Sequence, residues 1–203
     1  MIIVFTKCDL FKNGFKTFRE KYISDCASFS QVLYLNDLDP LREYKKSQVK
    51  ALVVDYEQAD IDLLIGLVDI KNQRSHLPVI LVTREARFDN TIENILINTV
   101  SDYTLDCTDP VRKLAFILRD LHGCTQHRIT VKNSAWFEAE KATNLTRRES
   151  MILPYIVCGK NNKEISRYLN LSQKTISHYR RSIYDKFNVS NLTGLFNIIS
   201  HIK

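Results

Sequence analysis

The chain has 203 residues, of which 44% are hydrophobic and 26% are charged. This composition is typical of a globular protein and excludes the disordered, collagen-like and fibrous classes. No apolar run approaches the roughly 18–20 residues that a membrane helix needs, and the apolar start lacks the basic leader of a signal peptide. Five cysteines that lie far apart and form no CxxC pair favour a reduced, cytoplasmic compartment.

The formal net charge of +6 is concentrated in one part of the chain. Residues 144–203 hold ten Lys and Arg against three Asp and Glu, which is a net charge of +7. Residues 1–143 hold nineteen basic against twenty acidic residues. A basic segment of this kind predicts a polyanionic partner for that segment alone.

Short apolar runs alternate with helical stripes along residues 1–122. The runs are expected to be strands, at residues 2–5, 32–35, 51–54, 79–82 and 101–105. The stripes repeat apolar residues at helical spacing and are expected to be helices, at residues 11–22, 61–68, 91–97 and 110–121. The alternation predicts an α/β domain with a doubly wound, five-stranded parallel sheet.

Two polar residues mark the ends of neighbouring strands in this expected sheet. Asp55 ends the third strand and Thr83 ends the fourth. With five β/α units, these residues resemble a response-regulator receiver domain, in which an Asp after the third strand accepts phosphate and a Thr or Ser follows the fourth. Ligands of such sheets bind at the carboxyl edge of the strands. The resemblance therefore implies that Asp55 and Thr83 belong to a phosphoacceptor site or its remnant.

The other residues of such a site are replaced. Thr6 and Lys7 stand where receivers have the acidic pair that holds Mg²⁺, and Asp106 stands where they have a Lys. A hard divalent cation needs carboxylate oxygens, so a lysine in this place opposes its binding. The segment therefore resembles a degenerate pseudo-receiver, in which Lys7 is expected to pair with Asp55 or Asp106.

Residues 123–143 are more polar and are predicted to form a linker, with the pair Trp136 and Phe137 docking it onto a domain. His122, Cys124 and His127 lie close together in sequence, but they number only three and do not have zinc-finger spacing. No metal site is therefore predicted.

Four helices are predicted in residues 144–203. Thr146 and Glu149 have the spacing of a capping box at the start of the first helix, which Pro154 is expected to kink. The other three helices are expected at residues 162–169, 173–187 and 191–202. This segment is thus a small all-α domain.

A run of about 45 residues in this segment carries a recognisable motif. Its residues are Leu145, Thr146, Arg148, Glu149, Gly159, Asn162, Lys163, Glu164, Ile165, Ser166, Leu169, Leu171, Ser172, Lys174, Thr175, Ile176, Ser177, Lys186, Phe187 and Val189. The run resembles the helix-turn-helix of LuxR-type (NarL/FixJ) transcription regulators, and departs from it at Pro154 and at Tyr179, where the family usually has His or Gln. The resemblance implies binding of double-stranded DNA, with no cofactor and no catalytic activity.

The resemblance also assigns roles around the third helix of the segment, which would enter the major groove. The family positions that face bases map onto Ser177, His178 and Arg181, and Arg181 can bond guanine through two hydrogen bonds. The positions that face phosphates map onto Lys163, Lys174, Thr175, Tyr179, Arg180 and Lys186. The residues expected only in the core are Ile165, Leu169, Leu171, Ile176 and Ile183.

The sequence thus predicts a transcription regulator with a pseudo-receiver at residues 1–122, a linker at 123–143 and a DNA-binding domain at 144–203. We expect it to bind DNA as a homodimer, or as a heterodimer with a related regulator, without phosphorylation. Two alternatives stay open. One is a response regulator that is phosphorylated on Asp55 with substitute Mg²⁺ ligands, and the other is a module that sequesters another regulator without binding DNA. The charge of +7 argues against the second alternative, because phosphate contacts account for it directly.

Overall fold

The computed structural model describes residues 1–24, 31–42, 44, 48–57, 60–84, 91–106, 109–121 and 143–201. The expected linker, apart from residue 143, lies outside these residues, as does the group His122, Cys124 and His127. The described elements fall into two compact units, one with the strands, α1 and α4 and the other with α2, α3 and α6–α9. The limits of the functional domains stay a prediction from the sequence.

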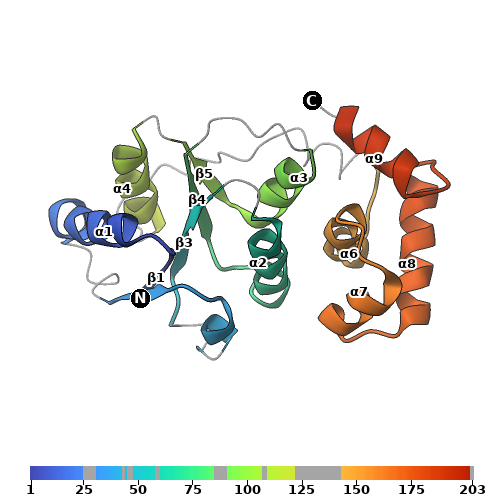
Figure 1. Cartoon of the computed structure of the whole chain (residues 1–203), viewed down its shortest axis with the longest axis horizontal. Coiled ribbons are helices and arrows are strands. Elements are labelled where there is room, and N and C mark those ends of the chain that lie inside the picture. The colour runs from blue at the N-terminus through green and yellow to red at the C-terminus, as the bar shows by residue number, and fades with distance from the viewer. Residues whose placement is uncertain are drawn as a thin grey trace. The chain divides into compact units, whose positions relative to one another are not determined.

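The first unit is built on a five-stranded, fully parallel sheet with the order β2-β1-β3-β4-β5 (Figure 1). Its strands are β1 (Ile2–Phe5), β2 (Val32–Leu35), β3 (Ala51–Tyr56), β4 (Val79–Thr83) and β5 (Tyr103–Leu105). A short 3-10 helix, η2 (Asp39–Arg42), follows β2. The predicted α/β fold with a parallel five-stranded sheet is confirmed.

Helices α1 (Asp9–Tyr22) and α4 (Pro110–Leu121) pack with alternate residues of the strands in one hydrophobic core. Ile2 and Val4 of β1 meet Phe15 of α1 and Leu118 of α4 in this core. The residue between them, Ile3, points to the other face of the sheet and is equally buried. The sheet is therefore buried on both faces, which is why its strands read as continuous apolar runs in the sequence.

The second unit contains six described helices. They are α2 (Ile61–Gln73), α3 (Thr91–Val100), α6 (Arg147–Val157), α7 (Asn162–Leu169), α8 (Gln173–Lys186) and α9 (Leu192–His201). Among all described residues, no helix is both long enough and apolar enough to cross a membrane.

Helices α6–α9 share a small apolar core. Ile156 of α6, Ile165 of α7, Ile176 and Ile183 of α8 and Leu195 of α9 are each fully buried. The burial predicted for the three isoleucines of α7 and α8 is thus confirmed. Leu169 and Leu171, which were also expected in the core, are only half-buried, because they lie at the turn where α7 ends.

Local signals set the ends of these helices. The predicted capping box of α6 is present, and a second box, formed by Asn161 and Glu164, begins α7. Gly159, with a φ of +75°, follows the end of α6, as a left-handed residue after a helix does. Pro154 lies inside α6 without ending the helix.

Candidate nucleic-acid interface

Helices α7 and α8 are joined by a turn with fixed backbone geometry. Asn170 ends α7 in the left-handed region, with φ of 51° and ψ of 46°. Ser172 then caps α8, since its Oγ accepts from the backbone N–H of Thr175 at 3.0 Å and lies 2.7 Å from the Thr175 hydroxyl. The turn thus fixes the direction of α8 relative to α7. The Thr175 hydroxyl is bonded to Ser172 within the same turn.

One face of α8 is exposed. Lys174, His178 and Arg181 are exposed and are separated by four and three residues, which places them on one side of a helix. Ser177, beside them, is half-buried. The structure therefore brings together on one face the three residues predicted to contact bases and one of those predicted to contact phosphates.

The cations on this face have no partner among the described residues. Within the part of the chain that the structure describes, the side chains of Lys174 and Arg181 make no hydrogen bond or ion pair. Lys163, at the start of α7, is likewise exposed and unpaired among these residues. The His178 ring has an aromatic neighbour in Tyr179, with ring centroids 6.1 Å apart. Three positive side chains are thus available to an external partner.

Arg180 is held inside the domain instead. Its Nε donates to Oδ1 of Asn162 at 2.9 Å, and its two terminal nitrogens donate to the Lys160 carbonyl at 2.6 Å and the Tyr184 hydroxyl at 3.4 Å. These bonds tie α8 to the residues that begin α7. A guanidinium has five N–H donors, so two of them are left for a phosphate.

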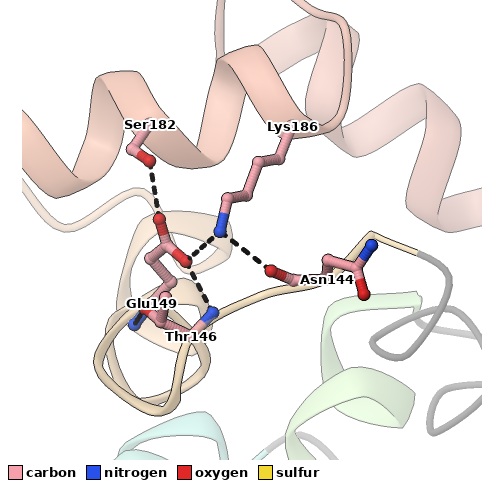
Figure 2. A network of polar contacts seen from close by, with 5 residues as sticks. All are labelled: Asn144, Thr146, Glu149, Ser182 and Lys186. Atoms are coloured by element: carbon pink, nitrogen blue, oxygen red, sulfur yellow. Dashed lines mark hydrogen bonds and ion pairs between the residues drawn. The ribbon is translucent and has the colours of Figure 1, made fainter.

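Lys186 also has a partner inside the domain. Figure 2 shows its Nζ between Oε2 of Glu149 and the backbone carbonyl of Asn144, at 2.6 and 2.8 Å. The other Glu149 oxygen accepts from the Ser182 hydroxyl of α8 at 2.6 Å. The Thr146 backbone N–H completes the set at 2.6 Å from Oε2. The carboxylate therefore joins the start of α6 to the second half of α8.

Glu149 is only 3% exposed, and burial alone would raise its pKa. The hydrogen bonds from Lys186, Ser182 and Thr146 outweigh that effect and lower the pKa of Glu149 to about 2. The carboxylate is therefore charged at any physiological pH. The sequence predicted its bond to Thr146, three residues away, but not its bonds to residues 33 and 37 positions further on.

The carboxyl edge of the sheet has a different arrangement from the one expected. The Thr6 hydroxyl donates to Oδ2 of Asp55 at 2.7 Å and accepts from the Cys8 backbone N–H at 3.0 Å. Lys7 Nζ lies 3.3 Å from Asp60. The expectation that Lys7 pairs with Asp55 or Asp106 is wrong. Successive side chains point to opposite sides, so Thr6 is buried at 7% exposure while the Lys7 side chain is 67% exposed.

The other two residues of the degenerate site are also bonded to neighbours. Asp106 forms an ion pair with Lys113 of α4 at 3.4 Å. The Thr83 hydroxyl donates to the Leu105 carbonyl at 3.4 Å. Among the described residues, no group of three His, Cys, Asp or Glu side chains could hold a metal ion.

Comparison with known proteins agrees with this geometry. Residues 143–199 match the family model of bacterial regulatory proteins of the LuxR family. The uncharacterized transcriptional regulatory protein YhcZ of Bacillus subtilis is 27% identical over 168 residues, which cover 77% of this chain and 76% of that protein. The uncharacterized response regulatory protein YgeK of Escherichia coli is 51% identical over 45 residues, or 22% of this chain and 31% of that protein.

Two solved structures share the fold. The RcsB response regulator of Salmonella typhimurium matches with a TM-score of 0.54 and 21% identity, over 100% of this chain and 97% of that one. An RcsB–DNA complex matches with a TM-score of 0.52 and 19% identity, over 98% and 97% of the two chains. This chain therefore shares the fold of these two RcsB structures.

The Glu149 bonds predict a specific effect on stability. Glu149→Gln leaves the Lys186 ammonium without its counter-charge, and we expect a loss of roughly 2 kcal/mol of unfolding free energy, as for hydrogen bonds to charged groups. Glu164→Gln is the matched control, because Glu164 forms a capping box on α7 with no lysine partner, and it should cost under about 1 kcal/mol. Urea unfolding of the full chain measures both, and equal losses would contradict the role given to the ion pair.

The pH dependence of the unfolding free energy gives a second test of the contribution of the Glu149 carboxylate. Its folded pKa of about 2 lies below the ordinary value of 4.5, so it stabilises the fold above pH 4.5 and loses that effect as the pH falls toward 2. The difference in unfolding free energy between the wild-type chain and Glu149→Gln should therefore shrink over this range. A difference that does not change with pH would show that Glu149 acts by shape rather than by charge.

Proposed function

Because residues 143–199 match the family model of bacterial regulatory proteins of the LuxR family, we propose that the chain is a transcription regulator that binds specific sites in double-stranded DNA. It binds through α8, as a dimer, in the cytoplasm and without phosphorylation. The observation that carries the proposal is the exposed face of α8, where Lys174 and Arg181 have no partner among the described residues. Phosphates and the guanine edge supply the acceptors that such cations need.

The residues on this face have different roles in the proposal. Arg181 donates two hydrogen bonds to the O6 and N7 atoms of a guanine, which distinguishes that base from the others. Ser177 and His178 contact neighbouring base edges and discriminate less. Lys174 and Lys163 bind phosphates, which sets the register of α8 in the groove and carries no sequence information.

Four further residues are proposed to make weaker phosphate contacts. Arg180 and Lys186 are already bonded inside the domain, so each has only its remaining donors for a phosphate. Thr175 contributes at the start of α8, next to its bond with Ser172. Tyr179 is half-buried beside His178, and its hydroxyl is the group that would reach the backbone.

Independence from phosphorylation rests on the carboxyl edge of the sheet. Transfer of a phosphoryl group to Asp55 needs Mg²⁺ to neutralise the charge on the transferred oxygens. Thr6 supplies a hydroxyl where a carboxylate is needed, and its hydrogen bond occupies one Asp55 oxygen. Asp106, paired with Lys113, adds negative charge where a phosphoryl oxygen needs a cation.

The proposal of a dimer rests on how little DNA one recognition helix can cover. One recognition helix covers a single short half-site, and helix-turn-helix proteins gain affinity and specificity by spanning two. The surface of α9, on which Ile198 is 38% exposed, is the candidate contact between DNA-binding domains, and the receiver-like sheet unit is the other. The partner is a second copy of this chain or a related regulator.

Two substitutions test the assignment of α8. Arg181→Ala should cost roughly 1–3 kcal/mol of specific binding and relax the choice at one base pair. Lys174→Ala should weaken binding to specific and random DNA alike and reduce the slope of log K against log salt by about one. Arg112→Ala, at an 84% exposed side chain of α4, is the control for lost charge. Unchanged affinity in both test variants, or an equal loss in the control, would contradict the assignment.

Phosphorylation is tested on the full chain with acetyl phosphate and Mg²⁺. We expect no gain in intact mass and no change in DNA affinity, because Thr6 and Lys7 stand where an acidic pair would hold the metal. Asp55→Ala should behave as the wild-type chain does. A stoichiometric gain in mass that raises DNA affinity and disappears in Asp55→Ala would replace this part of the proposal with a phosphorylation-dependent regulator.

Half-site spacing tests dimeric binding. Binding sites selected from genomic DNA should contain two half-sites, and inserting about half a helical turn, roughly 5 bp, should abolish stable binding because it turns one half-site away. Inserting a full turn, roughly 10 bp, keeps both half-sites on one side and is the control. Equal binding to an isolated half-site by a monomer would show that dimerisation is not required.

A further inference from the structure

The exposed face of α8 ends in a residue of opposite charge. Asp185 is exposed and lies four residues after Arg181, so it continues the line of Lys174, His178 and Arg181 along the helix. It is the single acidic residue of α8, whose sequence is QKTISHYRRSIYDK. A surface proposed to meet DNA therefore carries a carboxylate.

Among the residues that the structure describes, the Asp185 carboxylate has no structural role. Residues 144–203 contain three acidic residues, and two of them close capping boxes: Glu149 at Thr146 and Glu164 at Asn161. The Asp185 side chain makes no hydrogen bond or ion pair with any residue that the structure describes. The neighbouring Lys186 is bonded to Glu149, and no ion pair joins Asp185 to Arg181.

The position is also unfavourable for the helix itself. Asp185 lies in the last turn of α8, where the helix dipole favours cations and disfavours anions. An acidic residue before a basic one at i,i+4 is the favourable order on a helix, and Arg181 followed by Asp185 is the reverse. A residue that neither caps the helix nor pairs within it and opposes its dipole is best explained by its effect on a partner.

We propose that Asp185 is an electrostatic brake on DNA binding. Duplex DNA carries one phosphate charge per roughly 1.7 Å of its axis, so a carboxylate on the face of α8 that meets DNA lies within a Debye length, about 10 Å, of several phosphates. Its repulsion lowers the affinity of one domain for any DNA, whatever the sequence. The affinity of a single domain is thereby lowered, so stable binding depends more strongly on a second domain at a paired half-site.

This inference rests on the proposed function, because it requires that α8 meets DNA. It goes beyond that function by giving a physical reason for dependence on paired half-sites. The free energy of nonspecific binding comes almost entirely from phosphate contacts. A fixed repulsion therefore removes a larger share of that free energy than of the free energy of binding that also includes base contacts. Asp185 thus limits the residence of the protein on random DNA.

The test is Asp185→Asn in the full chain, measured by fluorescence anisotropy on a random duplex and on an isolated half-site selected with the wild-type chain. We expect affinity for both to rise by about threefold or more at low salt, with a salt slope steeper by about one. Glu20→Gln, which removes one negative charge from an exposed position on α1, is the matched control and should change neither quantity. Thermal unfolding of both variants verifies that the fold is kept.

Two results would overturn the proposal. Unchanged affinity and salt slope in Asp185→Asn would show that the carboxylate does not face DNA. A loss of affinity confined to one base pair of the selected site would show that Asp185 accepts a hydrogen bond from a base instead of repelling phosphates. If the wild-type chain shows no salt-dependent binding to any duplex, the proposed function fails first, which separates the two conclusions.

Discussion

The bond between the Glu149 carboxylate and α8 is the constraint on which the orientation of the exposed face of α8 depends. Glu149 belongs to the first turn of α6, yet two of its partners, Ser182 and Lys186, come from the last two turns of α8. Ser172 fixes the other end of α8 through its cap. Because both ends are held, the exposed face of the helix has one orientation relative to α6 and α7. The proposed role of α8 as a recognition helix needs this, since base readout requires that the donor side chains have fixed positions before DNA binds.

The basic side chains of α8 fall into two groups, one turned toward the other helices of the domain and one turned outward. Arg180 and Lys186 turn toward α6 and α7 and are bonded there, whereas Lys174 and Arg181 turn outward and are unpaired among the described residues. A Lys or Arg to Ala change in the first group removes a structural bond, so lost DNA binding would not distinguish a contact from a folding defect. The second group gives an interpretable readout because the fold does not use it.

Much of this architecture could be predicted from the sequence because its signals are local. Runs such as Ile2–Phe5 and the box formed by Thr146 and Glu149 depend on neighbours within a few residues, and the structure confirms them. The partners of Glu149 and Arg180 on other helices depend on tertiary packing and leave no pattern of spacing. The error at Lys7 has the same origin. A residue just beyond a strand can point to either side, and only the register of β1 against β3 decides that Thr6, not Lys7, meets Asp55.

The two units show opposite outcomes of one physical rule, that a charged group without an internal partner is available for an external one. At the carboxyl edge of the sheet, Asp55 accepts a hydrogen bond from Thr6, and Lys7 and Asp106 form ion pairs, so each of the three has a partner within the chain. On α8 the balance is reversed, because Lys174, Arg181 and Asp185 all lack such partners among the described residues. Two of these charges attract a polyanion and one repels it. Under the proposed function, the affinity of the domain for DNA is a difference between an attraction and a repulsion on one helix face, and a change of one charge can raise or lower it.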